Sequence, residues 1–251
     1  MDAIQTSFSR VEWKFLLSRE QAERLGALAA ERLEPDRYHR YRVANVYYDT
    51  EDHFLIRNSL DKPYFKQKLR LRSYGVPGDR DPVFMELKKK LDGRVLKRRV
   101  TLPAEEAIRY LEGKPPAEKG QIHREIDAFL AEYRPGPRIY IGYEREAFRE
   151  KPGEPELRLT FDREIRYRWN DLDLRLGEDG VPLLPEEAVL LELKSQYSFP
   201  LWLVRFLEQE GIRRISFSKY GAAFRRDVLG ESLSFTEDRE ISRPQTAAAN
   251  E

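Results

Sequence analysis

The sequence predicts an α+β protein in which helices pack outside an antiparallel sheet or a closed antiparallel β-barrel. Two observations predict this fold class. Segments that alternate apolar and charged residues recur along the 251-residue chain, as do strands that have one buried face. Helical patterns separate groups of these strands, without the regular strand–helix–strand rhythm that is typical of a parallel sheet.

The first half of the chain predicts one helix, then strands, then two further helices. Ser18 and Gln21 form a capping-box pattern, which an apolar stripe at helical spacing follows through Leu33. The turn signal Leu91-Asp92-Gly93 lies between two strands and predicts a hairpin. The expected strands cover 42–50, 64–74, 82–90 and 94–102, and the expected helices cover 105–113, which begins after Pro103, and 118–133.

The second half returns to strands after Pro135-Gly136-Pro137 and ends in helices. Strands are expected over 138–148, 155–169 and 188–196, with a turn at 178–180 inside a further hairpin. Helices are expected over 200–211 and 219–229. Residues 1–230 are therefore expected to form one domain. The segment 231–251 lacks hydrophobic periodicity and is expected to be a flexible tail.

Composition limits the classes of function. The 45 basic and 44 acidic side chains give a formal net charge of +1, so a protein that coats nucleic acid through general basicity is disfavoured and a basic site must be local. The absence of cysteine excludes disulfides, thiolate metal sites and a cysteine nucleophile. The sequence has neither a signal-peptide pattern nor a run of about 18 apolar residues, so a cytoplasmic protein is expected.

One strand segment, YFKQKLRLRSY (64–74), has an unusual face. Side chains alternate across a strand, so its four basic residues share one face, opposite Phe65, Leu69 and Leu71. These four residues are Lys66, Lys68, Arg70 and Arg72. The same alternation places on one face of their strands Arg10, Glu12 and Lys14; Glu86, Lys88 and Lys90; Lys97 and Arg99; Tyr143 and Arg145; Arg158, Thr160 and Asp162; and Glu192 and Lys194.

For any one strand, the simplest interpretation is a face open to water. The opposite faces, however, are apolar enough to pack under helices, as in Val83, Met85 and Leu87. If the sheet closes, the charged faces must look at one another. An interior lined with Lys and Arg is stable only if a polyanion or interior carboxylates compensate its charge. The sequence therefore predicts a site for a highly charged linear anion.

The residue types indicate which anion this site would take. Arginine forks and lysine point charges both suit phosphate. Glu12, Glu86 and Glu192 would repel phosphate unless they held a divalent cation that bridges to it. No P-loop or dinucleotide-binding glycine motif occurs. His39, His53 and His123 lie on unrelated expected elements, so each is expected to be a surface or packing residue.

Eight short segments together resemble the VTC domain, the polyphosphate polymerase branch of the triphosphate tunnel metalloenzymes in the CYTH-like superfamily. They are RVEWKF (10–15), KLRLRSYG (68–75), FMELKKK (84–90), VLKRRV (95–100), YEREAF (143–148), LRLTFD (157–162), LLELKSQ (190–196) and FSKY (217–220). The resemblance runs from Arg10 to about Phe224. It implies a closed antiparallel barrel of about eight strands that forms a triphosphate tunnel, with helices outside. It also implies Mn²⁺ or Mg²⁺, and transfer of the ATP γ-phosphate to a growing polyphosphate chain.

The resemblance also implies roles for individual residues. It places around the phosphates, as catalytic candidates, Lys14, Arg70, Arg72, Lys88, Lys97, Arg145 and Lys219. The strand faces and the resemblance together give as further substrate-binding candidates Arg10, Lys66, Lys68, Lys90, Arg99, Tyr143, Arg158, Lys194 and Ser218. The resemblance alone points to Ser218 and Lys219. Glu192 is the metal ligand that it implies, and Glu12 and Glu86 are the other two metal candidates.

One departure separates the branches of this superfamily. Hydrolytic tunnel enzymes of the CYTH type begin with Glu-x-Glu-x-Lys, whereas this chain has Arg10 at the first position, as in the polymerase branch. The expected substrates are therefore ATP and inorganic polyphosphate, with no nucleic acid. Coupling to a membrane would need a partner protein. The alternatives are a metal-dependent triphosphatase and a non-catalytic barrel that binds polyphosphate.

Overall fold

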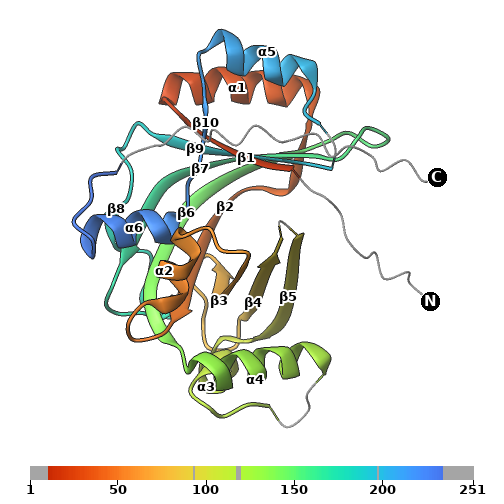
Figure 1. Ribbon diagram of the computed structural model, residues 1–251. Helices are drawn as coiled ribbons and strands as arrows, with labels where there is room; N and C mark the ends of the chain where they lie inside the picture. Colours follow the sequence, from red (N-terminus) through yellow and green to blue (C-terminus); the bar gives the residue numbers. More distant parts are fainter. Residues whose placement is uncertain (1–10, 93, 117–119, 197, 234–251) are drawn as a thin grey trace, which may run out of the picture.

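The computed structural model describes residues 11–92, 94–116, 120–196 and 198–233 (Figure 1). Its strands are β1 (Val11–Leu17), β2 (Glu34–Asp49), β3 (Phe65–Tyr74), β4 (Pro82–Leu91), β5 (Arg94–Pro103), β6 (Gly136–Arg149), β7 (Leu157–Arg168), β8 (Val181–Pro182), β9 (Val189–Ser195) and β10 (Arg214–Ile215). Its helices are α1 (Arg19–Arg32), α2 (Phe54–Leu60), α3 (Ala104–Leu111), α4 (Gln121–Tyr133), the 3₁₀ helix η1 (Leu174–Leu176), α5 (Leu201–Gln209) and α6 (Lys219–Asp227).

All ten strands belong to one antiparallel sheet, which confirms the predicted sheet type. The hydrogen-bonded order is β10-β1-β9-β7-β6-β2-β3-β4-β5, and β8 pairs with β7. The predicted closed barrel of about eight strands is not confirmed, because in the described part of the chain the two end strands of this order do not pair with each other. β10 pairs with β1 at Lys14 and Phe15 and so occupies part of the edge that closure would need.

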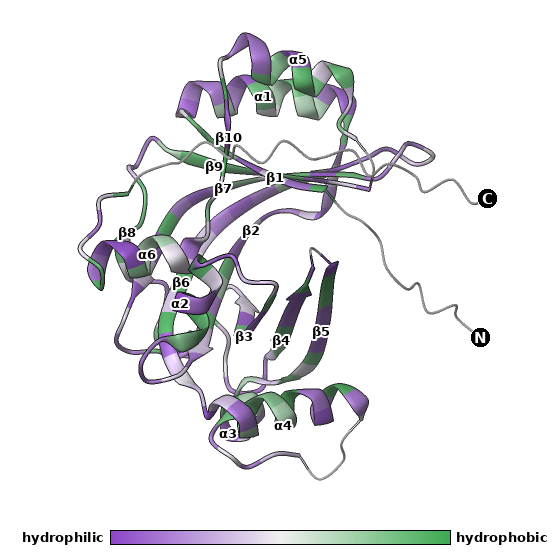
Figure 2. Ribbon diagram, in the orientation of Figure 1, coloured by the Kyte–Doolittle hydropathy of each residue, from purple (hydrophilic) through white to green (hydrophobic). Residues whose placement is uncertain are grey.

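The register of the strands produces the charged face that the sequence predicts. Lys68 lies opposite Lys88 in the β3–β4 pair, and Arg70 lies opposite Glu86. Lys14 lies opposite Glu192 in the β1–β9 pair. Residues directly opposite one another in a sheet project to the same side. We call the side that carries these residues the charged face. Figure 2 shows hydrophilic and hydrophobic positions alternating along β4 and β5.

Four helices cover the other side of the sheet. α1 and α5 pack over β1, β7 and β9 in an apolar cluster that includes Leu25, Leu159, Leu191 and Leu203. α3 and α4 pack over β3 and β4 in a second cluster, which includes Met85 and Phe129. The predicted packing of the apolar strand faces under helices is therefore confirmed. Figure 1 shows the two helix pairs at opposite ends of the molecule, with the curved sheet between them.

α6 packs on the charged-face side instead. Tyr220 and Phe224 of α6 join an apolar cluster with Val43, Ile141 and Leu190, which belong to three strands. The short helix α2 contributes Ile56 to the same cluster. α6 therefore covers one part of the charged face and brings its first turn next to the charged residues.

The expected boundaries differ from the structure in a few places. β2 begins at Glu34, well before the expected start at 42, and α2 and β10 were not predicted. The expected start of the fourth helix at 118, most of the expected tail (231–251) and the candidate Arg10 lie outside the described residues. No helix in the described ranges has the length and apolar character needed to cross a membrane.

Candidate functional site

The structure brings the predicted residues of seven strands and of α6 to the charged face. β3 and β4 supply Lys66, Lys68, Arg70, Arg72, Glu86, Lys88 and Lys90, in register with Lys97 and Arg99 of β5. β1 and β9 supply Glu12, Lys14, Glu192 and Lys194, while β6 and β7 supply Tyr143, Arg145 and Arg158. Lys219 is the first residue of α6, and the Ser218 hydroxyl caps this helix by accepting a hydrogen bond from the Gly221 amide.

Glu86 is the centre of the first charged cluster. Its side chain is 2% exposed, and Arg70 donates to its Oε2 from Nε at 2.8 Å and from Nη2 at 2.6 Å. Arg99 donates to Oε1 from Nε at 2.8 Å, and the Lys97 Nζ lies 2.7 Å from the same oxygen. Burial alone would raise the pKa of Glu86, but Arg70, Arg72 and Lys97 lower it well below its usual value. Glu86 is therefore an ionised anchor for surrounding cations.

Asp162 is the centre of the second cluster. It is fully buried, and Arg145 binds it in a bidentate manner, with Nε 2.6 Å from Oδ1 and Nη2 2.7 Å from Oδ2. The Lys219 Nζ lies 2.6 Å from Oδ2. Burial opposes ionisation of Asp162, but Arg145 and Lys219 lower its pKa below the ordinary value. The sequence placed Asp162 on the charged face without assigning it a role; in the structure it fixes two predicted catalytic candidates.

Glu192 lies beside this second cluster but has looser partners. Its carboxylate oxygens are 3.5 Å from the Nζ of Lys194 and of Lys219, 3.6 Å from Arg145 and 3.7 Å from Lys14. Burial would raise its pKa, yet these cations hold the pKa of Glu192 well below its usual range. The carboxylate is thus ionised and surrounded by positive charge, but its cations stand farther away than those of Asp162 and Glu86.

Four lysines at one end of the charged face lack such carboxylate partners. In the described part of the chain, Lys66, Lys68, Lys88 and Lys90 form no salt bridge, and the one hydrogen bond among them runs from Lys66 Nζ to the Ser59 carbonyl at 3.3 Å. Burial, together with Lys66, Lys14, Lys88 and Arg70, lowers the pKa of Lys68 to about 7. This end of the site has more positive charge than the protein itself neutralises.

The two halves of the charged face also interact across the sheet. Burial lowers the pKa of Lys88 of β4. Of the two nearby residues of β1, Glu12 opposes this shift and Lys14 adds to it. Lys14 likewise acts on Lys68 of β3. β1 is separated from β3 by four strands in the hydrogen-bonded order. The sheet therefore curves enough to bring its distant charged strands within electrostatic range.

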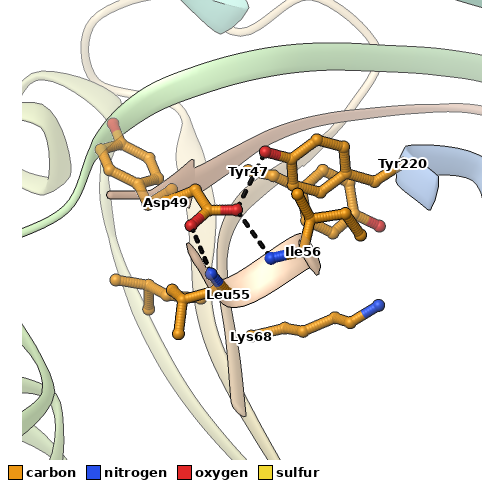
Figure 3. Close-up of a pocket in the computed structure, with 8 residues that line it drawn as sticks. Tyr47, Asp49, Leu55, Ile56, Lys68 and Tyr220 are labelled. Atoms are coloured by element: carbon orange, nitrogen blue, oxygen red, sulfur yellow. Dashed lines mark hydrogen bonds between the residues drawn. The ribbon is translucent and has the colours of Figure 1, made fainter. Parts of the chain in front are cut away.

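A buried carboxylate positions α6 relative to this face (Figure 3). Asp49, at the end of β2, accepts hydrogen bonds from the Leu55 and Ile56 amides at 2.8 and 3.0 Å and from the Tyr220 hydroxyl at 3.0 Å. These bonds join the first turn of α2 to α6, one residue beyond Lys219. Sequence reasoning missed Asp49 and Tyr220, because neither lies in an alternating charged pattern.

The family comparison agrees with this geometry. The family model described as "VTC domain" matches residues 9–226. The chain belongs to the VTC domain family. No curated protein gives a significant match. One similar solved structure is a candidate adenylate cyclase from Bacillus halodurans, with 18% identity, a TM-score of 0.51, and coverage of 83% of this chain and 93% of that chain.

A second similar structure is a candidate adenylyl cyclase from Hippeastrum that is described as having a dominant triphosphatase activity. It is 15% identical, has a TM-score of 0.49, and the match covers 91% of this chain and 99% of that chain. The likeness to the Bacillus halodurans structure, at 18% identity, concerns the fold. Membership of the VTC family itself places the chain among the tunnel metalloenzymes, which act on triphosphate-type substrates and use a divalent cation.

The acidic residues of this VTC domain fit a divalent cation only with help from the substrate. In the described ranges, no group of three or more acidic or histidine side chains is arranged to hold a metal ion. Glu12 and Glu192 are diagonal neighbours on the charged face, since Glu12 lies opposite Lys194 and Glu192 lies opposite Lys14. Mg²⁺ is commonly held by one or two carboxylates together with substrate phosphates, and this pair fits that pattern.

The three predicted metal candidates differ in how free their oxygens are. Both Glu86 oxygens already accept hydrogen bonds from cationic side chains. Burial would raise the pKa of Glu12, but Lys194 and Lys14 lower it, and the Glu12 carboxylate lies 3.6 Å from the Lys14 ammonium. The metal roles of all three remain predictions. The distances favour Glu192 with Glu12 over Glu86.

Proposed function

We propose that this VTC domain is a polyphosphate polymerase, which transfers the ATP γ-phosphate to the end of an inorganic polyphosphate chain with the help of Mn²⁺ or Mg²⁺. One observation carries the proposal. Lys66, Lys68, Lys88 and Lys90 continue the face that holds the two carboxylate-anchored clusters, yet they form no salt bridge with an acidic side chain among the described residues. A long anion would supply the missing negative charge along the whole row.

The anchored cations suit the transferred phosphoryl group. Phosphoryl transfer depends mainly on alignment and on neutralising charge. Arg70 and Arg145 have their guanidinium planes fixed by Glu86 and Asp162, respectively. Lys219 is fixed by the same Asp162. Such pre-organised donors lose little freedom when phosphate oxygens arrive.

The metal and the nucleophile complete the proposed mechanism. Glu192 and Glu12 would hold the cation, which neutralises phosphate charge and orients the triphosphate when bound. The nucleophile is a terminal phosphate oxygen of the chain. Because this oxygen is already anionic at neutral pH, the reaction does not need a general base. The protein's work is to hold the chain end in line with the γ-phosphate and to exclude water from that position.

Incubation with ATP and Mn²⁺ tests the proposal. The expected products are ADP and acid-insoluble polyphosphate, with a lag that a short-chain primer shortens and with little free phosphate. Lys88→Met should reduce polymer yield, because it removes charge from the row. The matched control Lys89→Met changes the neighbouring residue of β4, whose ammonium lies 3.8 Å from Glu125 of the outer helix α4, and should leave the yield unchanged.

The same assay separates the alternatives. Consumption of ATP to free phosphate without polymer, whether primed or unprimed, would replace the polymerase by a triphosphatase. Binding of tripolyphosphate without any turnover would indicate a non-catalytic polyphosphate-binding protein. Equal polymer yield in Lys88→Met and Lys89→Met would remove the lysine row from the proposed role.

A further inference from the structure

Four aromatic rings form a continuous row on β2, β3 and β4. The ring centroids of Tyr38 and Tyr41 are 6.3 Å apart, those of Tyr41 and Tyr74 are 5.5 Å apart, and those of Tyr74 and Phe84 are 5.4 Å apart. We call these four residues the aromatic row. The proposed phosphoryl transfer assigns no role to these rings, although Arg99 of the Glu86 cluster lies over one of them, Phe84. Edge-to-face packing accounts for their mutual contacts, but not for their place next to the cations.

The aromatic row begins where the anchored cations end. Tyr74 follows Arg72 by two residues on β3 and shares its side of the strand, and Phe84 lies opposite Arg72 in the β3–β4 register. Tyr41 lies opposite Arg145 in the β2–β6 register. The lysine row lies at the other end of β3. One strand therefore carries, in order, unpaired lysines, anchored arginines and an aromatic ring.

Two rings of the aromatic row are accessible. Tyr38 is 65% exposed and Tyr74 is 45% exposed, so a planar ligand has ring surface to contact. Arginines border the row: the Arg99 guanidinium lies 4.7 Å from the centre of the Phe84 ring, and Arg158 donates to the Tyr41 hydroxyl at 3.2 Å. Arg158 also lies 2.8 Å from Asp36, so its guanidinium is held beside the row.

We propose that the aromatic row binds the base of the nucleoside triphosphate, a proposal that rests on the proposed function. Bases stack on exposed aromatic side chains, and arginines beside such rings add to the attraction. Two residues of a strand span about 6.8 Å, which is comparable to the ribose that separates a base from its α-phosphate. A base on Tyr74 thus places the triphosphate over Arg72 and Arg70.

This placement gives the reaction a direction. With the base on Tyr74, the γ-phosphate points along β3 toward Lys68 and Lys66. The growing chain then lies over the lysine row and leaves at the end of β3 away from the aromatic row. The nucleoside diphosphate product can leave at the Tyr74 end without displacing the chain.

Calorimetry with two ligands tests the nucleoside site. ATP and tripolyphosphate each carry three linked phosphates, but only ATP carries a base. Tyr74→Ala should weaken ATP binding about tenfold, the effect typical of removing one stacked ring, and leave tripolyphosphate binding unchanged. Tyr74→Phe keeps the ring and should bind ATP like the parent protein. The matched control is Tyr64→Ala, which removes a 68% exposed tyrosine just before the opposite end of β3 and should not affect either ligand.

The outcomes separate this inference from the proposed function. Unchanged ATP affinity in Tyr74→Ala, an equal loss for both ligands, or a parent protein that binds tripolyphosphate but not ATP would each overturn the nucleoside site. If Tyr74→Ala discriminates as expected but no polymer forms from ATP, the nucleoside site stands and the polymerase does not. If polymer forms while Tyr74→Ala binds ATP normally, only the nucleoside site fails.

Discussion

At the residue scale, Glu192 differs from the other buried carboxylates of the charged face in the distance of its cations. Asp162 and Glu86 have cationic nitrogens at 2.6–2.8 Å, whereas the nitrogens around Glu192 lie at 3.5–3.7 Å. Close pairing satisfies a buried carboxylate and fixes the cation. The looser arrangement at Glu192 leaves lone pairs that a hard cation can use.

Glu192→Gln therefore tests the metal site. The substitution keeps the shape but removes the charge, so metal-dependent turnover should fall about a hundredfold or more. Tripolyphosphate binding in the presence of a chelator should persist or tighten, because a negative charge near the anion is gone. Steady-state rates against Mn²⁺ concentration and calorimetry measure the two effects. The control Glu187→Gln alters an exposed carboxylate 2.8 Å from Arg19. Parent-like activity in Glu192→Gln would remove this residue from the metal site.

Lys68 gives anion binding a dependence on pH. Burial and neighbouring cations lower its pKa to about 7, so above pH 7 the free folded protein has mostly lost this proton. A bound polyanion favours the charged form and raises the pKa again. Tripolyphosphate binding at pH 8 should therefore take up protons, with a smaller contribution from Lys97, whose pKa burial lowers to about 8. Calorimetry in two buffers of different ionisation enthalpy measures the uptake.

The same shift has a consequence for stability. The unfolded chain keeps the Lys68 proton up to its ordinary pKa near 10.5. Between that pH and about 7 the unfolded state binds more protons than the folded state, so this group reduces stability progressively as the pH falls. Lys68→Met should therefore unfold at a higher temperature than the parent at pH 7 without anion, and should take up fewer protons on binding. A Met variant with undiminished proton uptake would show that another group titrates.

At the element scale, a hydrogen bond from a side chain to a buried carboxylate helps to position α6, in addition to the apolar packing of this helix. The Tyr220 hydroxyl donates to Asp49, and Tyr220 follows Lys219 directly in the helix. Lys219 in turn holds Asp162. A small shift of α6 would therefore move a cation that is assigned to the transferred phosphoryl group.

Tyr220→Phe should reduce both stability and transfer rate. Loss of a hydrogen bond to a charged group should lower the free energy of unfolding by about 2 kcal/mol, measured by urea denaturation. The rate constant for transfer should fall more than the ATP affinity, because Lys219 acts on the reacting group. The control Tyr133→Phe removes a hydroxyl that accepts a 3.3 Å hydrogen bond from Gln67 on the helix-covered side, and should change the rate little. An unchanged rate in Tyr220→Phe would restrict this bond to a structural role.

The alternation of charged and apolar residues along the chain was sufficient to predict the strands that have one charged and one apolar face. It selected Lys68, Arg70 and Lys88 correctly for one side of the sheet, because each strand projects alternate side chains to opposite faces. It could not predict α2, a seven-residue helix that begins after His53 without a side-chain cap on that residue. Two of its first amides, those of Leu55 and Ile56, donate to Asp49 of the preceding strand, a contact that periodicity does not encode.

At the scale of the whole molecule, the alternation of apolar and charged residues determines which face of the sheet a side chain occupies, but it does not determine whether the sheet closes into a barrel. Which strands meet at the edges depends on pairs far apart in sequence, and here β10 takes part of the outer edge of β1. The sequence could not reveal this pairing, because a strand of only two residues is too short to show an alternating pattern. The central charges of the site were predictable as a set, whereas their division into anchored and unanchored cations depends on Asp162 and Glu86 contacts that only the tertiary structure supplies.

The excess of unanchored positive charge should make the whole fold sensitive to polyanions. Burial and neighbouring cations lower the pKa of Lys66, Lys68 and Lys88: Lys66 and Lys88 both act on Lys68, and Lys90 acts on Lys66, a sign of repulsion within the row. A ligand that binds only the folded state adds about 2.7 kcal/mol of stability at a hundredfold excess over its Kd. For a chain of this size that corresponds to a rise of about 5–10 °C in Tm. Differential scanning fluorimetry with millimolar tripolyphosphate measures the rise, with sulfate at equal ionic strength as the control.

The charge-removal variant Lys88→Met and its outer-face control Lys89→Met make this measurement specific. Lys88→Met should raise the Tm of the free protein, because one repelling charge is gone, and should reduce the additional rise caused by tripolyphosphate. Lys89→Met should keep the full ligand-induced rise, because its ammonium lies near Glu125 on the helix-covered side. If tripolyphosphate and sulfate shift the Tm equally in the parent protein, the charged face does not discriminate a linear polyanion from a small one, and the retention of a phosphate chain along the lysine row is wrong.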